Sequence, residues 1–134
     1  MLCLGRPACA EGFAHGTLDQ RIALYRDGQP LLLERLRPAP GRALQADGAA
    51  RRGHAACATL LATGADVGHL ELARESLACA SPALASATLL DDVLVCRLLA
   101  PHVAPLRVCL ERLWTLLRPT LLARDAHAPR IWST

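Results

Sequence analysis

Three side chains near the start of the sequence are of types that bind transition metals. Cys9, Glu11 and His15 lie close together in a stretch that also contains glycine. A thiolate, a carboxylate and an imidazole together suit a borderline ion such as Ni²⁺ or Zn²⁺. The same residues also fit an ordinary surface loop, and a third interpretation makes Cys9 a thiol nucleophile with His15 as its base. Nothing in the sequence supplies an orienting group or an oxyanion hole for such a thiol-dependent enzyme.

A single carboxylate, Glu34, lies within an apolar stretch. If this stretch is a strand, Glu34 shares one face with Leu32 and Leu36, while Arg35 points to the other face. A carboxylate on an apolar face must pair with a cation, coordinate a metal ion or line a wet passage. Glu34 is therefore a candidate metal contact. The alternative is a glutamate that reaches solvent or pairs with an arginine.

The composition excludes several classes of enzyme. All 15 residues counted as lysine plus arginine are arginine. A P-loop and a Schiff-base enzyme both need a lysine, so neither chemistry belongs to this chain. The sequence also lacks the GxSxG, HExxH, GxGxxG and EF-hand motifs.

The charge and hydropathy patterns do not indicate a nucleic-acid partner or a membrane. The net charge is only +3 and aromatic residues make up 3% of the chain, too few for a stacking platform. No apolar run approaches the roughly 18 residues that span a bilayer. The N-terminus lacks the basic and apolar regions of a secretory signal, so we expect a cytoplasmic protein.

The cysteines are spread along the chain and form no CxxC motif, which argues against a zinc ribbon or a thioredoxin-type site. In a cytoplasmic protein they are predicted to be buried free thiols rather than disulfides. The six are Cys3, Cys9, Cys57, Cys79, Cys96 and Cys109.

The elements that must position these residues begin with a β-hairpin over residues 17–37. Apolar and polar residues alternate with the period of a strand, and Asp27 and Gly28 suit the two left-handed positions of a tight turn. Pro30 lacks an N–H group, so we expect it at a strand start or at a sheet edge.

A second hairpin is predicted at 84–90 and 93–100, with its turn at Asp91 and Asp92. Both runs are almost continuously apolar, which predicts strands covered on both faces. Residues 54–62 predict one more strand, whereas 38–50, rich in proline and glycine, predict a loop.

Two helices complete the expected fold. Asp66 is a suitable N-cap for a helix over 67–79, and a longer helix at 103–118 carries an apolar stripe. Pro119 should end or kink the longer helix. The apolar face of the first is Val67, Leu70, Ala73 and Leu77; that of the second is Val103, Leu106, Leu110, Leu113, Trp114 and Leu117. The second stripe predicts a core face, or alternatively a face that binds a partner.

These elements predict a mainly β fold with two helices, of the α+β class. The 134 residues suit a single region over 1–134 without an internal domain boundary.

Several stretches, taken in order, resemble the family of urease accessory proteins UreD, called UreH in some bacteria. They are CLGRPA (3–8), EGF (11–13), RDGQPLLLER (26–35), ATLL (58–61 and 87–90), LVCRLL (94–99), LWTLLRP (113–119) and PRIWST (129–134). None is a catalytic signature, so the specificity comes from their number and order. Members of the family are about twice as long, and the chain resembles only their C-terminal half.

The resemblance implies half of a β-helix-like fold and a non-enzymatic role in urease maturation. UreD-like proteins are scaffolds that bind UreF, which recruits the GTPase UreG, and the assembly docks on apo-urease. Nickel delivery is coupled to GTP hydrolysis by UreG, so no nucleotide is expected on this chain.

The resemblance also implies a water-filled nickel path lined by acidic groups. Glu34 then becomes a candidate for transient Ni²⁺ contact, because oxygen ligands hold nickel loosely enough to release it. Glu11, Cys9 and His15 are further candidates. Partner contacts are expected at Trp114, Arg118, Arg130 and Trp132.

An inert fragment is the competing hypothesis, since half of the family's length is absent and an exposed sheet edge would remain. The DNA upstream of Met1 separates the two hypotheses.

Overall fold

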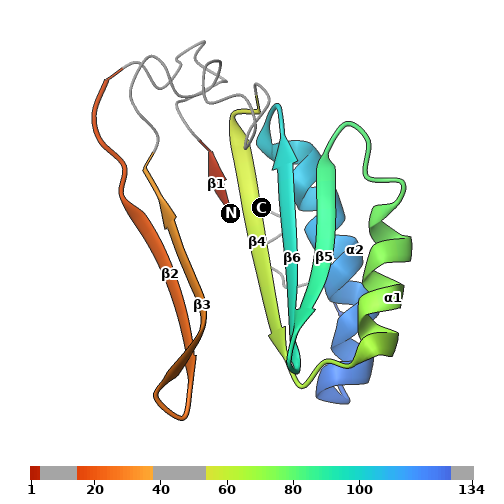
Figure 1. The fold of residues 1–134 in the computed structure, drawn as a ribbon. Helices are drawn as coiled ribbons and strands as arrows, with labels where there is room; N and C mark the ends of the chain where they lie inside the picture. Colours follow the sequence, from red (N-terminus) through yellow and green to blue (C-terminus); the bar gives the residue numbers. More distant parts are fainter. Residues whose placement is uncertain (4–14, 38–53, 128–134) are drawn as a thin grey trace. The chain divides into compact units, whose positions relative to one another are not determined.

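The computed structural model describes residues 1–3, 15–37 and 54–127 (Figure 1). Its contacts group the chain into two compact units, Met1–Cys3 with Ala56–Thr134, and Leu4–Ala55. The sequence showed no boundary between them.

The larger unit contains a four-stranded antiparallel sheet with two helices. The strand order is β1-β4-β6-β5, so β6 is central and is paired along its length on both sides. The elements are β1 (Leu2–Cys3), β4 (Ala56–Thr63), α1 (Val67–Leu77), β5 (Leu84–Leu90), β6 (Val93–Ala100) and α2 (Val103–Leu122). Together with the hairpin described below, they confirm the predicted α+β class.

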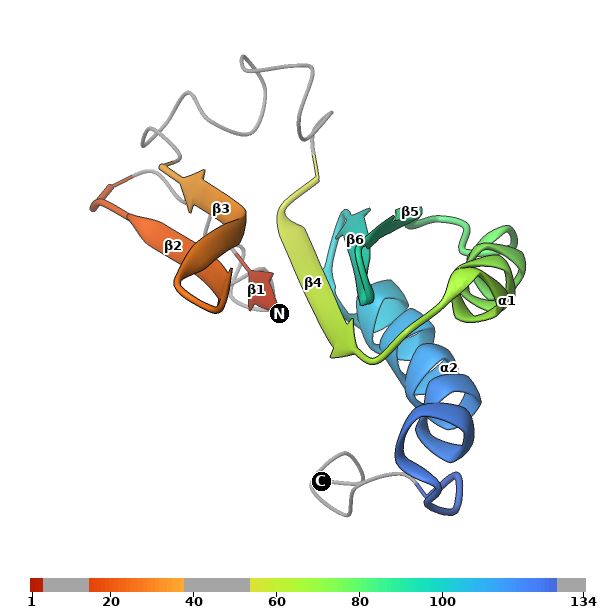
Figure 2. The same cartoon turned by 60° about the horizontal axis from the view of Figure 1, so that its bottom comes forward.

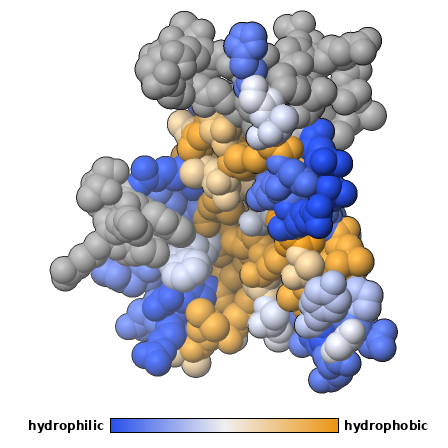
Figure 3. All heavy atoms as spheres, turned by 90° about the vertical axis from the view of Figure 1, so that its left-hand side faces the viewer, coloured by the Kyte–Doolittle hydropathy of each residue, from blue (hydrophilic) through white to orange (hydrophobic). Residues whose placement is uncertain are grey.

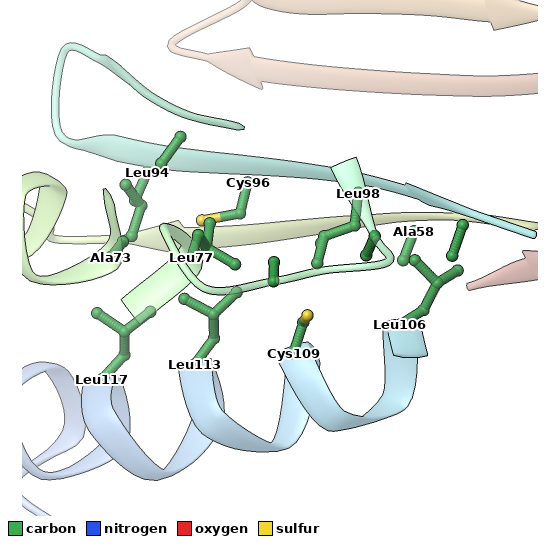
Figure 4. Close-up of a cluster of buried hydrophobic side chains, with 14 of the residues drawn as sticks. Ala58, Ala73, Leu77, Leu94, Cys96, Leu98, Leu106, Cys109, Leu113 and Leu117 are labelled. Carbon is green, nitrogen blue, oxygen red and sulfur yellow. The ribbon is translucent and has the colours of Figure 1, made fainter. Parts of the chain in front are cut away.

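Both helices cover the same face of this sheet, as Figure 2 shows. Small alanines on β4 and β5 let the helices approach the strands closely, while larger side chains on β6 fill the layer between them. The cluster in Figure 4 includes Ala58, Leu94, Cys96 and Leu98 from the sheet, Ala73 and Leu77 from α1, and Leu106, Cys109, Leu113 and Leu117 from α2. The predicted stripe of α2 is therefore a core face.

The start of α1 is fixed by a reciprocal cap. The Asp66 carboxylate accepts a hydrogen bond from the His69 backbone N–H at 2.9 Å, and the Asp66 N–H donates to His69 Nδ1 at 3.3 Å. Each side chain satisfies a backbone group at the helix start, as the sequence predicted for Asp66. The Ala65 N–H donates to the Asp92 carbonyl at 2.8 Å, which joins the entry of α1 to the β5–β6 turn.

Three details of the prediction for the larger unit are wrong. Val67 is 60% exposed, so the buried face of α1 begins one turn later, at Leu70. The α2 helix does not end at Pro119 but continues to Leu122. Because Pro119 has no N–H group, the helix lacks only one backbone hydrogen bond there. Beyond it Leu121 still packs against the core, which favours continuation of the helix.

The strand β5 is the third correction. Only β6 is largely covered on both faces, whereas β5 is an edge strand with one open face. Ala85, Ala87 and Leu89 face the helices, while Leu84 and Ser86 on the other face are exposed. A continuous apolar run therefore marked a central strand in one case and a half-exposed edge strand in the other.

The smaller unit contains the hairpin of β2 (Gln20–Arg26) and β3 (Gln29–Leu36). Asp27 and Gly28 have φ values of 49° and 77°, which confirms the predicted left-handed turn. Pro30 is the second residue of β3, at the start of the strand as expected. Tyr25 pairs with Pro30 but Leu24 pairs with Leu32, so Leu31 is an extra residue that forms a β-bulge.

None of the helices in the described part of the chain is long and apolar enough to cross a bilayer.

Leu113 tests whether α2 anchors the core of the larger unit. Because its side chain is fully buried, Leu113→Ala should lower the free energy of unfolding by about 2–5 kcal/mol. The matched control is Val108→Ala on the exposed side of the same helix, which should cost about 0.5 kcal/mol. Urea unfolding followed by circular dichroism measures both, and equal effects would contradict this packing.

Candidate functional site

Glu34 lies in the middle of the hairpin, on the face that is more buried. The register places it opposite Ile22, next to the pair formed by Leu24 and Leu32. All four side chains are half-buried or buried. Glu34 shares this face with Leu32 and Leu36, as predicted, and it is not without an interaction partner in the structure. The geometry thus confirms an acidic group within apolar surroundings.

The opposite face of the hairpin carries a cluster of arginines around one aspartate. Arg35 donates two hydrogen bonds to Asp19, from Nε to Oδ1 and from Nη2 to Oδ2, both at 2.8 Å. Arg21 and Arg37 approach Asp19 Oδ2 at 3.4 and 3.6 Å. The hydrogen bonds from Arg35, then its charge, a hydrogen bond from Arg21 and the charge of Arg37, lower the pKa of Asp19 well below its usual range.

The sequence did not lead to a prediction of this cluster, although it carries a signal for it. Extending the register that pairs Arg21 with Arg35 brings Asp19 opposite Arg37 on the same face. That register applies only beyond the bulge at Leu31, which the sequence does not reveal. Residues 19, 21, 35 and 37 also alternate with the apolar positions. This period of two, which the sequence does show, predicts that the charged residues of each strand lie on the face opposite its apolar ones.

Of the other proposed metal ligands, only His15 lies among the described residues. His15 is exposed and precedes β2, whereas Cys9 and Glu11 fall outside the described residues. Within 1–3, 15–37 and 54–127, no group of three His, Cys, Asp or Glu side chains could hold a metal ion. The structure therefore does not bring Glu34 and His15 together with a third ligand.

Trp114 and Arg118, two of the predicted partner contacts, lie one turn apart on α2 and contact each other. The Arg118 guanidinium lies 5.0 Å from the centre of the Trp114 ring, a cation–π contact. Both also bind the segment that follows the helix: Trp114 Nε1 donates to the His127 carbonyl at 3.0 Å, and Arg118 Nε to the Asp125 carbonyl at 2.9 Å. Arg130 and Trp132 lie outside the described residues.

An apolar groove runs between α2 and the edge strand β4. Its volume is about 240 Å³. Leu60 and Ala62 line it from the strand, and Leu113, Leu117 and Leu121 from the helix, with Trp114 and Arg118 beside them. Figure 3 shows apolar side chains exposed beside polar ones on the face that it draws.

The five described cysteines are all free, as expected, but only two of them are buried. Burial raises the pKa of the Cys96 thiol to about 11 and also raises that of Cys109. Both are therefore protonated and unreactive at neutral pH. Cys3 and Cys57 are half-buried, and Cys79 is exposed.

Comparison with known proteins identifies the chain. A profile described as "UreD urease accessory protein" matches residues 1–133. The chain belongs to the UreD family. This UreD chain is 41% identical over 134 residues to "Urease accessory protein UreD" of Pseudomonas fluorescens, covering 100% of the chain and 47% of the relative.

Two further relatives give the same result. The UreD chain is 44% identical over 133 residues to the UreD protein of Pseudomonas entomophila, covering 99% of the chain and 46% of the relative. It is 37% identical over 140 residues to "Urease accessory protein UreD 2" of Brucella anthropi, covering 100% of the chain and 49% of the relative. The chain thus spans about half the length of the curated relatives it matches.

Thiol labelling tests the environment of the cysteines. Under native conditions at neutral pH, a maleimide should modify Cys79 quickly and leave Cys96 and Cys109 unmodified until the protein unfolds, because burial suppresses their thiolates. Peptide mass mapping assigns the label. Labelling of Cys96 as fast as Cys79 would contradict its burial.

The pKa of Asp19 tests the arginine cluster. Arg35→Gln should raise this pKa more than Arg37→Gln, because Arg35 supplies the hydrogen bonds and Arg37 only its charge. Since the pKa is lower in the folded than in the unfolded state, the stabilisation is present above the unfolded value of 3.8 and is lost as the pH falls through the folded one. NMR titration of the Asp19 carboxyl carbon measures the effect. An equal response to both variants would contradict the geometry.

Proposed function

We propose that the chain acts in urease maturation as a UreD-type scaffold. It binds UreF, holds UreG through UreF, and places this assembly on apo-urease while nickel is inserted. The observation that carries the proposal is the profile match over residues 1–133, together with identities of 37–44% to relatives named as urease accessory proteins. In this assembly UreG binds and hydrolyses the nucleotide, and the work takes place in the cytoplasm.

In this role Ni²⁺ is cargo, and Glu34 is its proposed contact on this chain. The carboxylate lies on a half-buried strand face between leucine and isoleucine side chains, with Gln20 on the same face of the hairpin. An acidic oxygen ligand in such surroundings attracts a divalent cation without binding it as tightly as a thiolate would. Glu11, Cys9 and His15 are proposed as further contacts on the same path.

The arginine cluster supports this assignment from the other face of the hairpin. Arg21, Arg35 and Arg37 are gathered around Asp19, whose ionised carboxylate offsets part of their charge. Because side chains alternate along a strand, these cations project away from the face that carries Glu34. The hairpin therefore keeps these three arginines off the face proposed for a cation, although Arg26, the last residue of β2, lies on that face.

The proposed contact with UreF lies at the end of α2. Trp114 and Arg118 fix the segment that follows the helix through two hydrogen bonds to its carbonyl groups. A Trp–Arg pair is also a common anchor of protein interfaces. Arg130 and Trp132, further along the chain, are proposed to extend the same contact.

A complementation experiment tests the function. The chain, joined to the remaining half of a UreD relative, should restore urease activity in a strain that lacks its own UreD, and should retain UreF in a pull-down. Retention of UreF without restored activity would limit the chain to binding. Failure of both, with the fusion expressed and folded, would overturn the proposal and favour the inert-fragment hypothesis.

Glu34→Gln tests the nickel contact separately from partner binding. In the same fusion, this variant should lower urease activation by roughly tenfold, because removing a group that supports a metal site typically lowers metal affinity or activity by about that factor. UreF binding should be unchanged. Glu71→Gln, an equivalent change at an exposed position of α1, is the matched control. Equal activation by the two variants would exclude Glu34 from the nickel path.

A further inference from the structure

The edge of β4 is paired along only part of its length. On one side β4 pairs with β6 from Ala56 to Thr63. On the other side β1 pairs only with Ala56 and Cys57. Beyond these two residues, the described part of the chain places no strand beside 58–63. Every second backbone N–H and C=O group of that stretch therefore points away from the sheet.

The opposite edge of the same sheet is treated differently. The helix α1 packs against the edge strand β5. Arg74 on this helix donates from Nε to the outward carbonyl of Ala87 at 3.2 Å. A helix and a charged side chain that cover an edge are devices that prevent further strand pairing. Only the β4 edge is left available among the described strands of this sheet.

The groove beside the β4 edge is shaped to receive side chains. Leu60 and Ala62 point toward the helices and form one wall, and Leu113, Leu117 and Leu121 of α2 form the other. A strand added to this edge would direct every second side chain into the groove. The hydrogen bonds would come from the β4 backbone, and the apolar contacts from α2.

We propose that the β4 edge and this groove are the docking site of one further strand of a UreD polypeptide, supplied by the residues that lead into the Met1 position in longer UreD chains. The β1–β4 register already sets the alignment, because Leu2 pairs with Cys57 and Cys3 with Ala56. Continuing it upstream places Met1 opposite Ala58. The second and fourth residues before Met1 then face Leu60 and Ala62, and their side chains enter the groove.

Two observations favour this occupant over a separate partner. The chain spans less than half the length of its relatives in Pseudomonas, so longer UreD chains contain ample polypeptide for a further strand. Moreover, β1 runs antiparallel to β4 and reaches the paired end of the edge. A strand that simply continues β1 needs no new loop, and so its docking costs little additional chain entropy. The surface is independent of the proposed nickel path.

Hydrogen exchange tests the docking directly. The chain is compared with a version extended at its N-terminus by the residues that precede the matched segment in the Pseudomonas fluorescens relative. In the extended chain, alternate amides of 58–63 should exchange at a rate about tenfold lower than in the unextended chain, or lower still. The remaining amides of β4, bonded to β6, should be unchanged and serve as an internal control.

Two variants of the extended chain separate docking from general stability. Ala62→Glu places a charge in the groove and should abolish the added protection. Thr59→Glu, on the strand face turned away from the helices and outside the groove lining, should retain it. Unchanged exchange of β6 amides in both variants shows that the sheet itself is intact.

A cross-link tests the register. A cysteine at the third residue before Met1 should form a disulfide with Leu61→Cys, which lies opposite it, and not with Leu60→Cys, whose side chain points to the other face. Unchanged edge amides together with no cross-link would overturn the proposal. It would also be overturned if the edge amides were already protected in the unextended chain, or if a dimer of that chain were to protect them.

Discussion

The β-bulge at Leu31 determines what the smaller unit presents on each face. A two-residue turn at Asp27 and Gly28 without a bulge would pair Arg21 with Glu34 and place the two opposite charges together. The extra residue shifts β3 by one position, so Glu34 lies opposite Ile22 and Arg35 lies opposite Arg21. One inserted residue therefore places Glu34 on a mainly apolar face and Arg21 and Arg35 together on the other.

The same shift explains why Asp19 is needed. Once Arg21 and Arg35 are directly opposite one another, their like charges would repel. The carboxylate of Asp19 accepts hydrogen bonds from both and lies near Arg37 as well. Its lowered pKa keeps it ionised even in acidic solution where an ordinary aspartate would take up a proton. The charge pattern of the hairpin is thus a consequence of its register rather than a separate feature.

Much of the fold could be predicted from local signals that act within a few residues. The turns at Asp27–Gly28 and Asp91–Asp92 and the cap at Asp66 each depend on the intrinsic preferences of one or two side chains. The bulge could not be predicted, because Leu31 is chemically the same as its neighbours. The exposure of β5 and the continuation of α2 past Pro119 depend on tertiary packing. In the candidate site, the alternation of apolar and polar residues predicted which face of the strand carries Glu34. The residue opposite it, Ile22, could not be predicted because it depends on the bulge.

The contact between Arg74 and Ala87 limits how this sheet can assemble. A sheet with two open edges allows copies to add one after another, as in a fibre that has no natural end. With the β5 edge closed, the β4 edge is the side left for pairing among the described strands of this four-stranded sheet. The helix α1 and its Arg74 thereby limit edge-to-edge pairing through the described strands of this sheet to two members, whether the second member is another copy or the rest of the same polypeptide.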